Sequence, residues 1–387
     1  MADTSVKFFH SEMTGAPTLN GLAGSLINVL NACLINGFGL KNVDTCTVTG
    51  GVAKLNISTG HSAVVGSVIL VAGATPAALN GEQRVTATTT TSISFATSVT
   101  DQSATGTITV KQAPAGWVSP FVGTNLATYK SPDLAATGCV LRVDDTATRS
   151  SRVVGYETMT DINTGTGPFP TSAQRTGGSY WTKSSSADAV TRSWILVGDA
   201  RSFIFIRTYS AGSMANEVTT FGDISTLKTP DPYACILTGM PSDQAANSPT
   251  NNANLWLSEI TKNELYMPRS YTGIGTAVQM SKSSPAFTMY NTSWISGNNA
   301  LAYTPAYPNP VDGGVYFSPL YFLENSGTAL RGICPGYYFI ANNVTTNTFA
   351  NKDQITGVVG MIGKTMLLHY ANNNGGYAAV DITGPWR

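Results

Sequence analysis

The sequence carries little charge. Asp, Glu, Lys and Arg make up 11% of its 387 residues, and 22 basic residues balance 22 acidic ones, whereas an ordinary soluble domain is about 25% charged. Because no Lys/Arg cluster is available to neutralise phosphates, we expect no nucleic-acid partner. Two explanations fit the low charge: a surface rich in Ser, Thr, Asn and Gly, or a surface covered by partner proteins. An uncharged, β-rich surface favours permanent assembly with partners.

Residues for metal binding and nucleophilic catalysis are also scarce. The five cysteines lie far apart and form no Cys-x-x-Cys pair, so we expect buried free thiols: Cys33, Cys46, Cys139, Cys235 and Cys334. There are three histidines, His10, His61 and His369. His61 lies in a turn before a strand, and His369 lies within the apolar run MLLHY, where half-buried packing is expected. We therefore predict no catalytic, cofactor-binding or metal-ligating residue, no cofactor, and a protein that is not an enzyme.

Long hydrophobic runs are absent. No apolar stretch approaches the ~20 residues that span a bilayer, and the start, MADTSVKFFH, lacks the charged-then-apolar order of a secretory signal. These features predict no membrane association and a protein that is made and assembled in a cytoplasm.

One small group of acidic residues is the only local candidate for acid–base chemistry. Asp144 and Asp145 follow the predicted strand CVLRV, with Glu157 and Asp161 nearby. A glycan-cleaving enzyme needs two carboxylates that face each other across a groove. Adjacent residues in a strand point apart, so a turn with an Asx hydrogen bond is the favoured interpretation of the aspartate pair. Glu12 and Asp381 are no stronger candidates for acid–base catalysis than these four residues.

The segment Gly360-Met-Ile-Gly363-Lys364-Thr365 resembles a phosphate-binding loop only superficially. Such a loop needs a glycine where Val358 stands, and it must open a helix so that backbone amides meet the phosphate. Here the segment leads into the predicted strand MLLHY, and we reject the motif.

Apolar residues alternate with polar ones from Cys46 onward. Five short strands are predicted, around residues 53–57, 68–72, 85–87, 93–95 and 108–110. Gly50-Gly51 and Asn80-Gly81 supply the positive φ angles of tight turns. Residues 46–112 are therefore predicted to form a small five-stranded β-barrel or sandwich module. The charged residues near it are single and expected to face solvent: Lys54, Glu82, Arg84, Asp101 and Lys111.

Residues 1–45 are predicted to be an arm followed by one helix of about a dozen residues. Its apolar face repeats at a spacing of three and four, with Asn20 or Ser25 as the N-terminal cap and Gly37 at the C-terminal end. Core packing is favoured over subunit contact for this helix.

Residues 113–387 are predicted to be a larger antiparallel β-sandwich body. A linker is expected at 113–133, a long surface excursion at 161–191 and a hairpin at 193–207, with a C-terminal hairpin pairing 365–370 with 377–382. Further strands are predicted at 139–143, 151–156, 234–239, 254–260 and 315–323. The late tyrosines indicate either a sandwich core, which is favoured, or a recognition surface for sugars or proteins: Tyr303, Tyr307, Tyr316, Tyr321, Tyr337 and Tyr338. The fold class is mainly β, with the small module inserted into the body.

The stretch Gly60–Phe95 resembles a small β-module common in structural proteins of tailed bacteriophages. The likeness rests on Gly60-His61, Val65-Gly66-Ser67-Val68, Gly73-Ala74, Asn80-Gly81, Arg84-Val85-Thr86 and Ser92-Ile93-Ser94-Phe95, and it extends to residues 6–41, 116–131, 152–170 and 381–387. It implies a structural subunit of a phage particle (virion) made in the bacterial cytoplasm. The family brings no active site.

Three placements in such a particle stay open. The first is a tail, collar or fibre-anchoring subunit that acts by homo-oligomeric assembly. The second is a head decoration or head-fibre protein, and the third is a tail-tip protein that binds a carbohydrate receptor. The implied partners are copies of itself and other virion proteins (tail, portal-adaptor or capsid subunits), with a host surface glycan as the partner in the third alternative.

Overall fold

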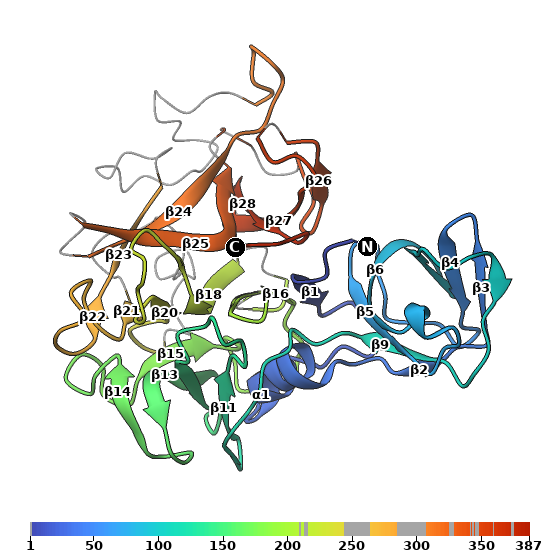
Figure 1. Ribbon diagram of the computed structural model, residues 1–387. Helices are drawn as coiled ribbons and strands as arrows, with labels where there is room; N and C mark the ends of the chain where they lie inside the picture. The colour runs from blue at the N-terminus through green and yellow to red at the C-terminus, as the bar shows by residue number, and fades with distance from the viewer. Residues whose placement is uncertain are drawn as a thin grey trace.

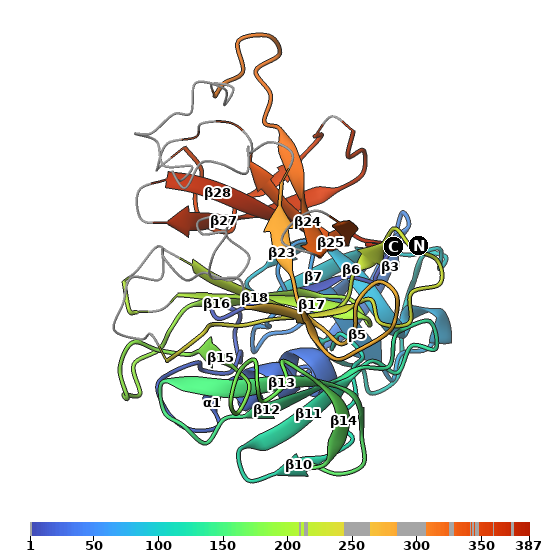
Figure 2. The ribbon, with the colours of Figure 1, turned by 90° about the vertical axis from the view of Figure 1, so that its left-hand side faces the viewer.

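The computed structural model describes residues 2–208, 210–212, 216–243, 264–284, 307–324, 329–340, 342, 344, 348–358, 360–372 and 375–387. The chain is mainly β, as predicted, and its strands pair antiparallel in four sheets. Three sheets stack as the layers of a body, and the fourth forms a module beside them (Figures 1 and 2).

The module is an eight-stranded curled sheet in the order β2-β9-β5-β6-β7-β4-β3-β8. Its strands are β2 (Lys41–Asn42), β3 (Thr45–Thr49), β4 (Val52–Asn56), β5 (Val68–Ala72), β6 (Gly81–Thr89), β7 (Ser92–Ala96), β8 (Gln102–Ser103) and β9 (Thr109–Gln112), with a 3₁₀ turn, η2 (Ala77–Leu79). The five predicted strands correspond to β4, β5, β6, β7 and β9. The two-residue strands β2 and β8 were not predicted, because two residues give no period. The threonine-rich β3 was also missed, although its buried Cys46 and Val48 alternate with polar residues.

The lower layer of the body in Figure 2 contains six strands. They are β10 (Val122–Gly123), β11 (Leu126–Lys130), β12 (Val140–Asp144), β13 (Ser150–Met159), β14 (Gly165–Phe169) and β15 (Ser179–Thr182). The predicted linker at 113–133 therefore contains β10 and β11, and the predicted surface excursion contains β14 and β15. Both predictions were wrong because these strands are short and lie among glycines and prolines, some of them within β10 and β14, while tertiary pairing with β12 and β13 stabilises them.

The middle layer has the order β1-β16-β17-β18-β20-β21-β22. Its strands are β1 (Lys7–His10), β16 (Trp194–Gly198), β17 (Ser202–Thr208), β18 (Asn216–Asp223), β20 (Cys235–Thr238), β21 (Leu265–Met267) and β22 (Val278–Gln279). The predicted hairpin at 193–207 is confirmed as β16–β17, and both strands are buried along their whole length because layers cover both faces. The arm also contributes a strand that was not predicted, since β1 pairs with β16.

The upper layer has the order β23-β24-β25-β28-β27-β26, with β19 also paired to β25. Its strands are β19 (Ser225–Thr226), β23 (Ser281–Ser283), β24 (Phe317–Glu324), β25 (Ala329–Ile340), β26 (Gln354–Thr356), β27 (Thr365–Asn372) and β28 (Gly375–Asp381). The C-terminal hairpin is confirmed as β27–β28. The strand predicted at 254–260 lies outside the described residues.

The one α-helix of the described residues, α1 (Ser25–Leu30), continues as a π-helical segment, η1 (Asn31–Asn36), which gives the predicted dozen residues. Its apolar face joins the main core of the body, and Gly37 ends it at a positive φ of 69°. The predicted capping residues were wrong, because neither Asn20 nor Ser25 caps the helix with its side chain. The carboxylate of Asp145, distant in sequence, accepts the first free N–H groups instead.

The hydrophobic interior is divided in a way that separates the module from the body. One continuous core joins the three layers and the helix, and the module has its own core built on Leu55, Val71, Phe95 and their neighbours. A smaller third cluster packs on the upper sheet around Leu368 and Tyr377. In the described ranges, no helix has the length and apolar character needed to cross a membrane.

Candidate functional site: the junction of module, arm and C-terminal segment

Arg84 of the module is the centre of the contact between module and body. Its guanidinium donates to five backbone carbonyl oxygens: those of Asp3 at 2.6 Å, Val6 at 3.1 Å, Gly66 at 2.7 Å, Ile382 at 2.9 Å and Thr383 at 3.0 Å. These carbonyls belong to the N-terminal arm, the module and the segment after β28. One side chain therefore ties together three parts of the chain that are remote in sequence.

The sequence places Arg84 at this point through the pairing of β6 with β5, where Arg84 stands opposite Val68. Burial lowers the pKa of Arg84, and the charges of Asp3, Asp381 and Glu82 oppose that shift. Five N–H donors are the full hydrogen-bonding capacity of a guanidinium. The five carbonyl oxygens therefore satisfy this half-buried cation without a paired carboxylate.

Further polar contacts join the module to the body. Lys7 of β1 forms a 3.0 Å ion pair with Glu82, and Lys111 donates to the carbonyl of Asn36. The prediction that the module's single charges face solvent was therefore wrong for Arg84, whereas Glu82 and Lys111 stay partly exposed beside their partners. Spacing along the sequence contains no signal for these contacts, because their partners lie in other elements.

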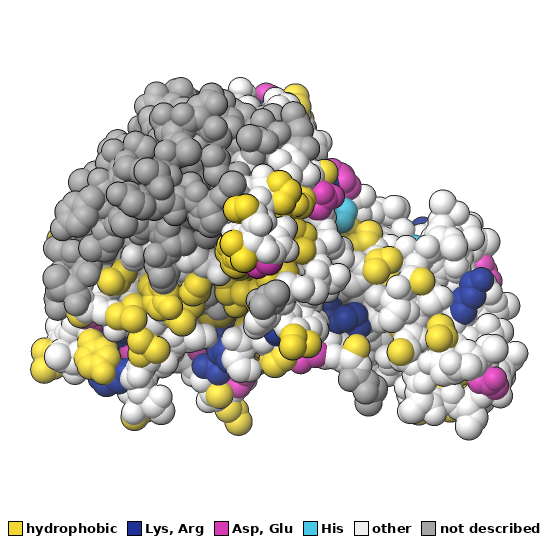
Figure 3. All heavy atoms as spheres, turned by 90° about the horizontal axis from the view of Figure 1, so that it is seen from above, with side chains coloured by type: hydrophobic (Ala, Val, Ile, Leu, Met, Phe, Trp, Pro, Cys, Tyr) yellow, Lys and Arg dark blue, Asp and Glu magenta, His cyan; other side chains and the backbone are white. Residues whose placement is uncertain are grey.

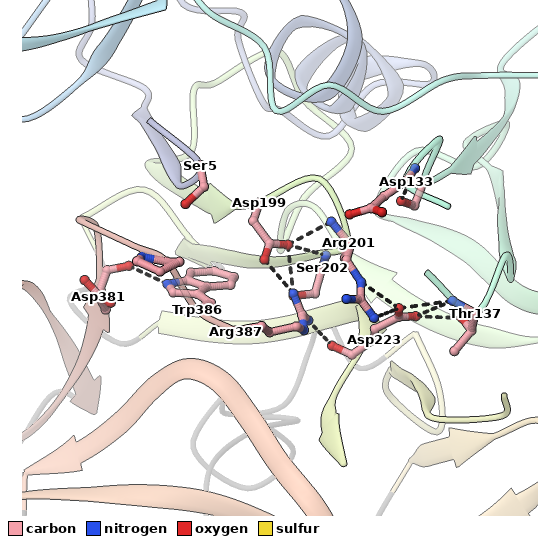
Figure 4. A network of polar contacts seen from close by, with 12 residues as sticks. Ser5, Asp133, Thr137, Asp199, Arg201, Ser202, Asp223, Asp381, Trp386 and Arg387 are labelled. Atoms are coloured by element: carbon pink, nitrogen blue, oxygen red, sulfur yellow. Dashed lines mark hydrogen bonds and ion pairs between the residues drawn. The ribbon is translucent and has the colours of Figure 1, made fainter. Parts of the chain in front are cut away.

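The C-terminal segment is anchored in the body by the network drawn in Figure 4. Arg387 bonds the Oδ2 of Asp199 at 2.5 Å and the hydroxyl of Ser202 at 2.8 Å, and it also donates to the carbonyl of Asp223. Trp386 donates its indole N–H to the carbonyl of Asp381 at 2.9 Å. The segment following β28 of the upper layer is thereby fixed to the turn between β16 and β17 of the middle layer.

The same network reaches the lower layer. Arg201 bonds the Oδ2 of Asp223 at 2.9 and 3.1 Å, and the hydroxyl of Thr137, in the loop before β12, donates to the Oδ1 of Asp223 at 2.6 Å. The network therefore joins all three layers through charge-assisted hydrogen bonds, which are stronger than neutral ones.

An open hollow of about 380 Å³ lies beside this network. Its lining is a mixture of small apolar residues and charged ones: Ala135, Ala136, Thr137, Arg201, Asp223, Ile224, Thr226, Lys228, Thr229, Pro230, Asp231, Pro232 and Ala234. Both carboxylates are engaged, Asp223 by Arg201 and Asp231 by the buried Arg331 at 2.7 and 3.0 Å. Because both are held in ion pairs, these two carboxylates are not free to act as a base.

The histidines considered above lie in separate places. Burial, assisted by Lys352, lowers the pKa of His10 to about 4, and burial lowers that of His369 to about 4. His369 is fully buried rather than half-buried. His61 lies where its Nε2 is 2.8 Å from the carbonyl oxygen of Thr89. Among the described residues, no group of three or more His, Cys, Asp or Glu side chains is arranged to hold a metal ion.

The four clustered acidic residues each have their own partners. Asp144 accepts from the N–H and hydroxyl of Thr146, which is the predicted Asx arrangement, and Asp161 forms a similar turn with the N–H of Asn163. Glu157 forms a bidentate pair with Arg269 at 2.7 and 2.9 Å. The Asx prediction was wrong for Asp145, which is completely buried against Lys183 and caps α1.

The remaining sequence candidates are also held in structural contacts. Lys364 donates to the carbonyls of Gly384 and Pro385 and forms a 3.0 Å ion pair with Asp381, and the segment leads into a strand, as predicted. Glu12 pairs with Lys352. All five cysteines are buried free thiols, as predicted.

The late tyrosines are distributed between core and surface. Tyr337 is fully buried, while Tyr307 and Tyr338 pack against the small cluster on the upper sheet. Tyr316 is exposed and donates to Asp312, and Tyr303 lies outside the described residues.

Comparison with known proteins finds no protein-family model that matches the chain and no curated protein that matches its sequence.

Proposed function

We propose that the protein is a structural subunit of a tailed-phage particle, acting by packing β-surfaces against copies of itself and against other particle proteins. The first assignment is a tail-associated subunit: a tail, collar or fibre-anchoring protein. A head decoration or head-fibre protein is the alternative. The resemblance of residues 60–95 and their flanks to phage proteins supports a phage particle as the setting. The distribution of charge supports assembly with other proteins as the mode of action.

The observation that carries the assembly role is that the chain has few charges and that several of them are paired inside the fold. Four ion pairs have every partner at or below 6% exposure: Lys183 with Asp145, Arg207 with Glu217, Arg331 with Asp231, and Arg331 with Glu324. Over the module, the face drawn in Figure 3 consists mainly of backbone and of side chains that are neither hydrophobic nor charged, with single charged side chains between them. A neutral surface packs against a neighbour without the desolvation cost of burying charges.

Exposed apolar side chains supply the attractive part of such contacts. Leu134, Val311 and Ile362 are almost completely exposed, and hydrophobic side chains gather on the body in Figure 3. Apolar surface presented among neutral polar groups is the composition of an interface rather than of a surface that must stay free in water.

The module suits a docking or display role because it has its own core and joins the body through the polar contacts around Arg84. Such a unit can present a surface away from the body while the body packs into the particle.

The decisive experiment is protein identification by mass spectrometry in purified particles of a phage that carries this gene. We expect the chain as a stoichiometric component, and its absence from particles that assemble normally would sink the proposal. Electron microscopy of particles whose protein lacks residues 46–112 then separates the two assignments, since density is lost from the tail region or from the head. The carbohydrate-receptor alternative is tested by incubating the purified protein with host polysaccharide, where specific binding or cleavage would favour it.

A further inference from the structure

The pair formed by Lys183 and Asp145 differs from the other lysine–carboxylate pairs of the described chain. Both side chains are 0% exposed, and Nζ lies 2.5 Å from Oδ1. In each of the other lysine pairs, at least one partner is 22% exposed or more: Lys7 with Glu82, Lys352 with Glu12, and Lys364 with Asp381. The remaining buried pairs use arginine, whose guanidinium stays charged in proteins. Among the residues that the structure describes, Lys183 alone combines a potential nucleophile with a carboxyl group where both side chains are fully buried.

The two carboxylate oxygens of Asp145 lie in different surroundings. Oδ2 accepts the backbone N–H groups of Leu26 at 2.9 Å and Ile27 at 3.2 Å. Oδ1 accepts the hydroxyl of Ser151 at 2.6 Å and is the oxygen in contact with Lys183. Two fixed N–H donors on one oxygen are the arrangement that stabilises the oxyanion of a tetrahedral intermediate in acyl transfer. The hydroxyl on the other oxygen can donate to it as it departs.

The nucleophile is also held in place. Nζ of Lys183 donates to the carbonyls of Leu22 at 2.7 Å and Ala147 at 2.9 Å, which fixes the end of a normally flexible side chain beside the carboxyl group. Burial raises the pKa of Asp145 and lowers the pKa of Lys183, and both shifts outweigh the attraction between the two charges. Both directions favour the neutral amine and the neutral carboxylic acid, the forms that can condense.

We propose that Lys183 and Asp145 join in an intramolecular amide (isopeptide) bond after the chain has folded. A proton passes from Nζ to Oδ1, and the neutral amine then attacks Cγ while the N–H groups of Leu26 and Ile27 hold Oδ2. The Cγ–Oδ1 bond breaks, and Oδ1 leaves as water with the proton it already carries and a second proton from Nζ. One C–N bond forms, one C–O bond breaks and one water is released, so the step needs no oxidant, reductant or cofactor.

This bond would cross-link the end of β12 to the residue that follows β15, within the lower layer and beside the start of α1. It would close a covalent loop across a sheet in a chain whose five cysteines are free thiols. The inference is independent of the proposed function, since the mass of the isolated protein decides it.

The test is the intact mass of the purified, fully denatured full-length protein. We expect it to be lower than the sequence mass by one water, and a mass equal to the sequence mass overturns the proposal. Tryptic digestion then locates the bond: cleavage at Lys183 is blocked, and residues 143–149 appear joined to residues 176–192. A mass deficit with these two peptides separate would also overturn it, because dehydration then occurred elsewhere.

Two variants serve as matched controls. Lys183→Met is expected to restore the full sequence mass, whereas Lys364→Met, which removes the lysine of the half-exposed pair with Asp381, is expected to keep the deficit. If Lys183→Met still lacked the mass of one water and Lys364→Met had the full sequence mass, the bond would not involve Lys183 and the proposal would be overturned. If Lys183→Met does not fold, the mass and the peptide map of the unaltered protein still decide the question.

Discussion

Replacing Arg84 by glutamine tests whether the carbonyl cage holds the module on the body. The substitution removes five hydrogen bonds from a cation to backbone oxygens. Hydrogen bonds to charged groups are each worth about 1.5–3 kcal/mol, but several of these carbonyls are partly exposed and can bond water after the change. We therefore expect a loss of about 3 kcal/mol in the free energy that holds the module against the body, well below the sum over five bonds.

In the unaltered protein we expect the module and the body to unfold together, and in the variant we expect them to unfold separately. Because the module has its own core, Arg84→Gln should split thermal unfolding into two transitions and speed proteolysis of the segments that connect module and body, near residues 37–44 and 113–117. Lys54→Gln is the matched control, since Lys54 is an exposed charge on the same module. If Arg84→Gln and Lys54→Gln melt alike and are cut at the same rate, the cage does not hold the module.

Three further changes test other parts of the fold. Glu217→Gln leaves the fully buried Arg207 without its 3.1 Å partner and should cost about 3–5 kcal/mol in urea unfolding, whereas a loss under 1 kcal/mol would contradict a role for the pair. Arg387→Ala removes the contacts with Asp199 and should lower stability by about 2–3 kcal/mol, seen as an earlier thermal transition of the body; an unchanged transition would show that the C-terminal segment is not anchored there. The pKa of His369 is about 4 in the fold against 6.5 for the free side chain, so the unfolded chain binds more protons between these values and stability must fall as the pH drops from 6.5 to 4. At pH 5 this loss is about 2 kcal/mol, and His369→Gln should flatten the stability-against-pH curve in that window; an equal slope in both proteins would refute the assignment.

Local pattern accounts for the elements that the sequence predicted well. The hairpins β16–β17 and β27–β28 and the strands β4 to β7 have apolar residues in runs or at a period of two, bounded by glycine and asparagine turns. Two of the strands that were missed, β14 and β1, lack that signal. In β14 (GTGPF) glycine and proline interrupt the pattern, and β1 is a four-residue edge strand whose pairing partner lies some 190 residues away.

The candidate site could not be predicted in the same way. Arg84 stands in a polar strand with the same local surroundings as an exposed charge, and its partners lie up to 299 residues away in the sequence. Asp145 was interpreted as a turn residue because it follows the predicted strand CVLRV together with Asp144, and only Asp144 forms such a turn. Burial, which distinguishes the two aspartates, depends on where α1 packs.

The amino-acid sequence by itself determined the class of the protein: mainly β, low in charge, with a separate small module and buried free thiols. These properties follow from composition and from periodicity over a few residues, and neither depends on long-range contacts. Only the tertiary structure decided the three-layer stacking, the cage around Arg84, the network that anchors Arg387, and the enclosure of Lys183 with Asp145. The physical reason is that a cation or a carboxylate acquires its role from groups that surround it in space, and the chain brings those groups together from positions far apart in the sequence.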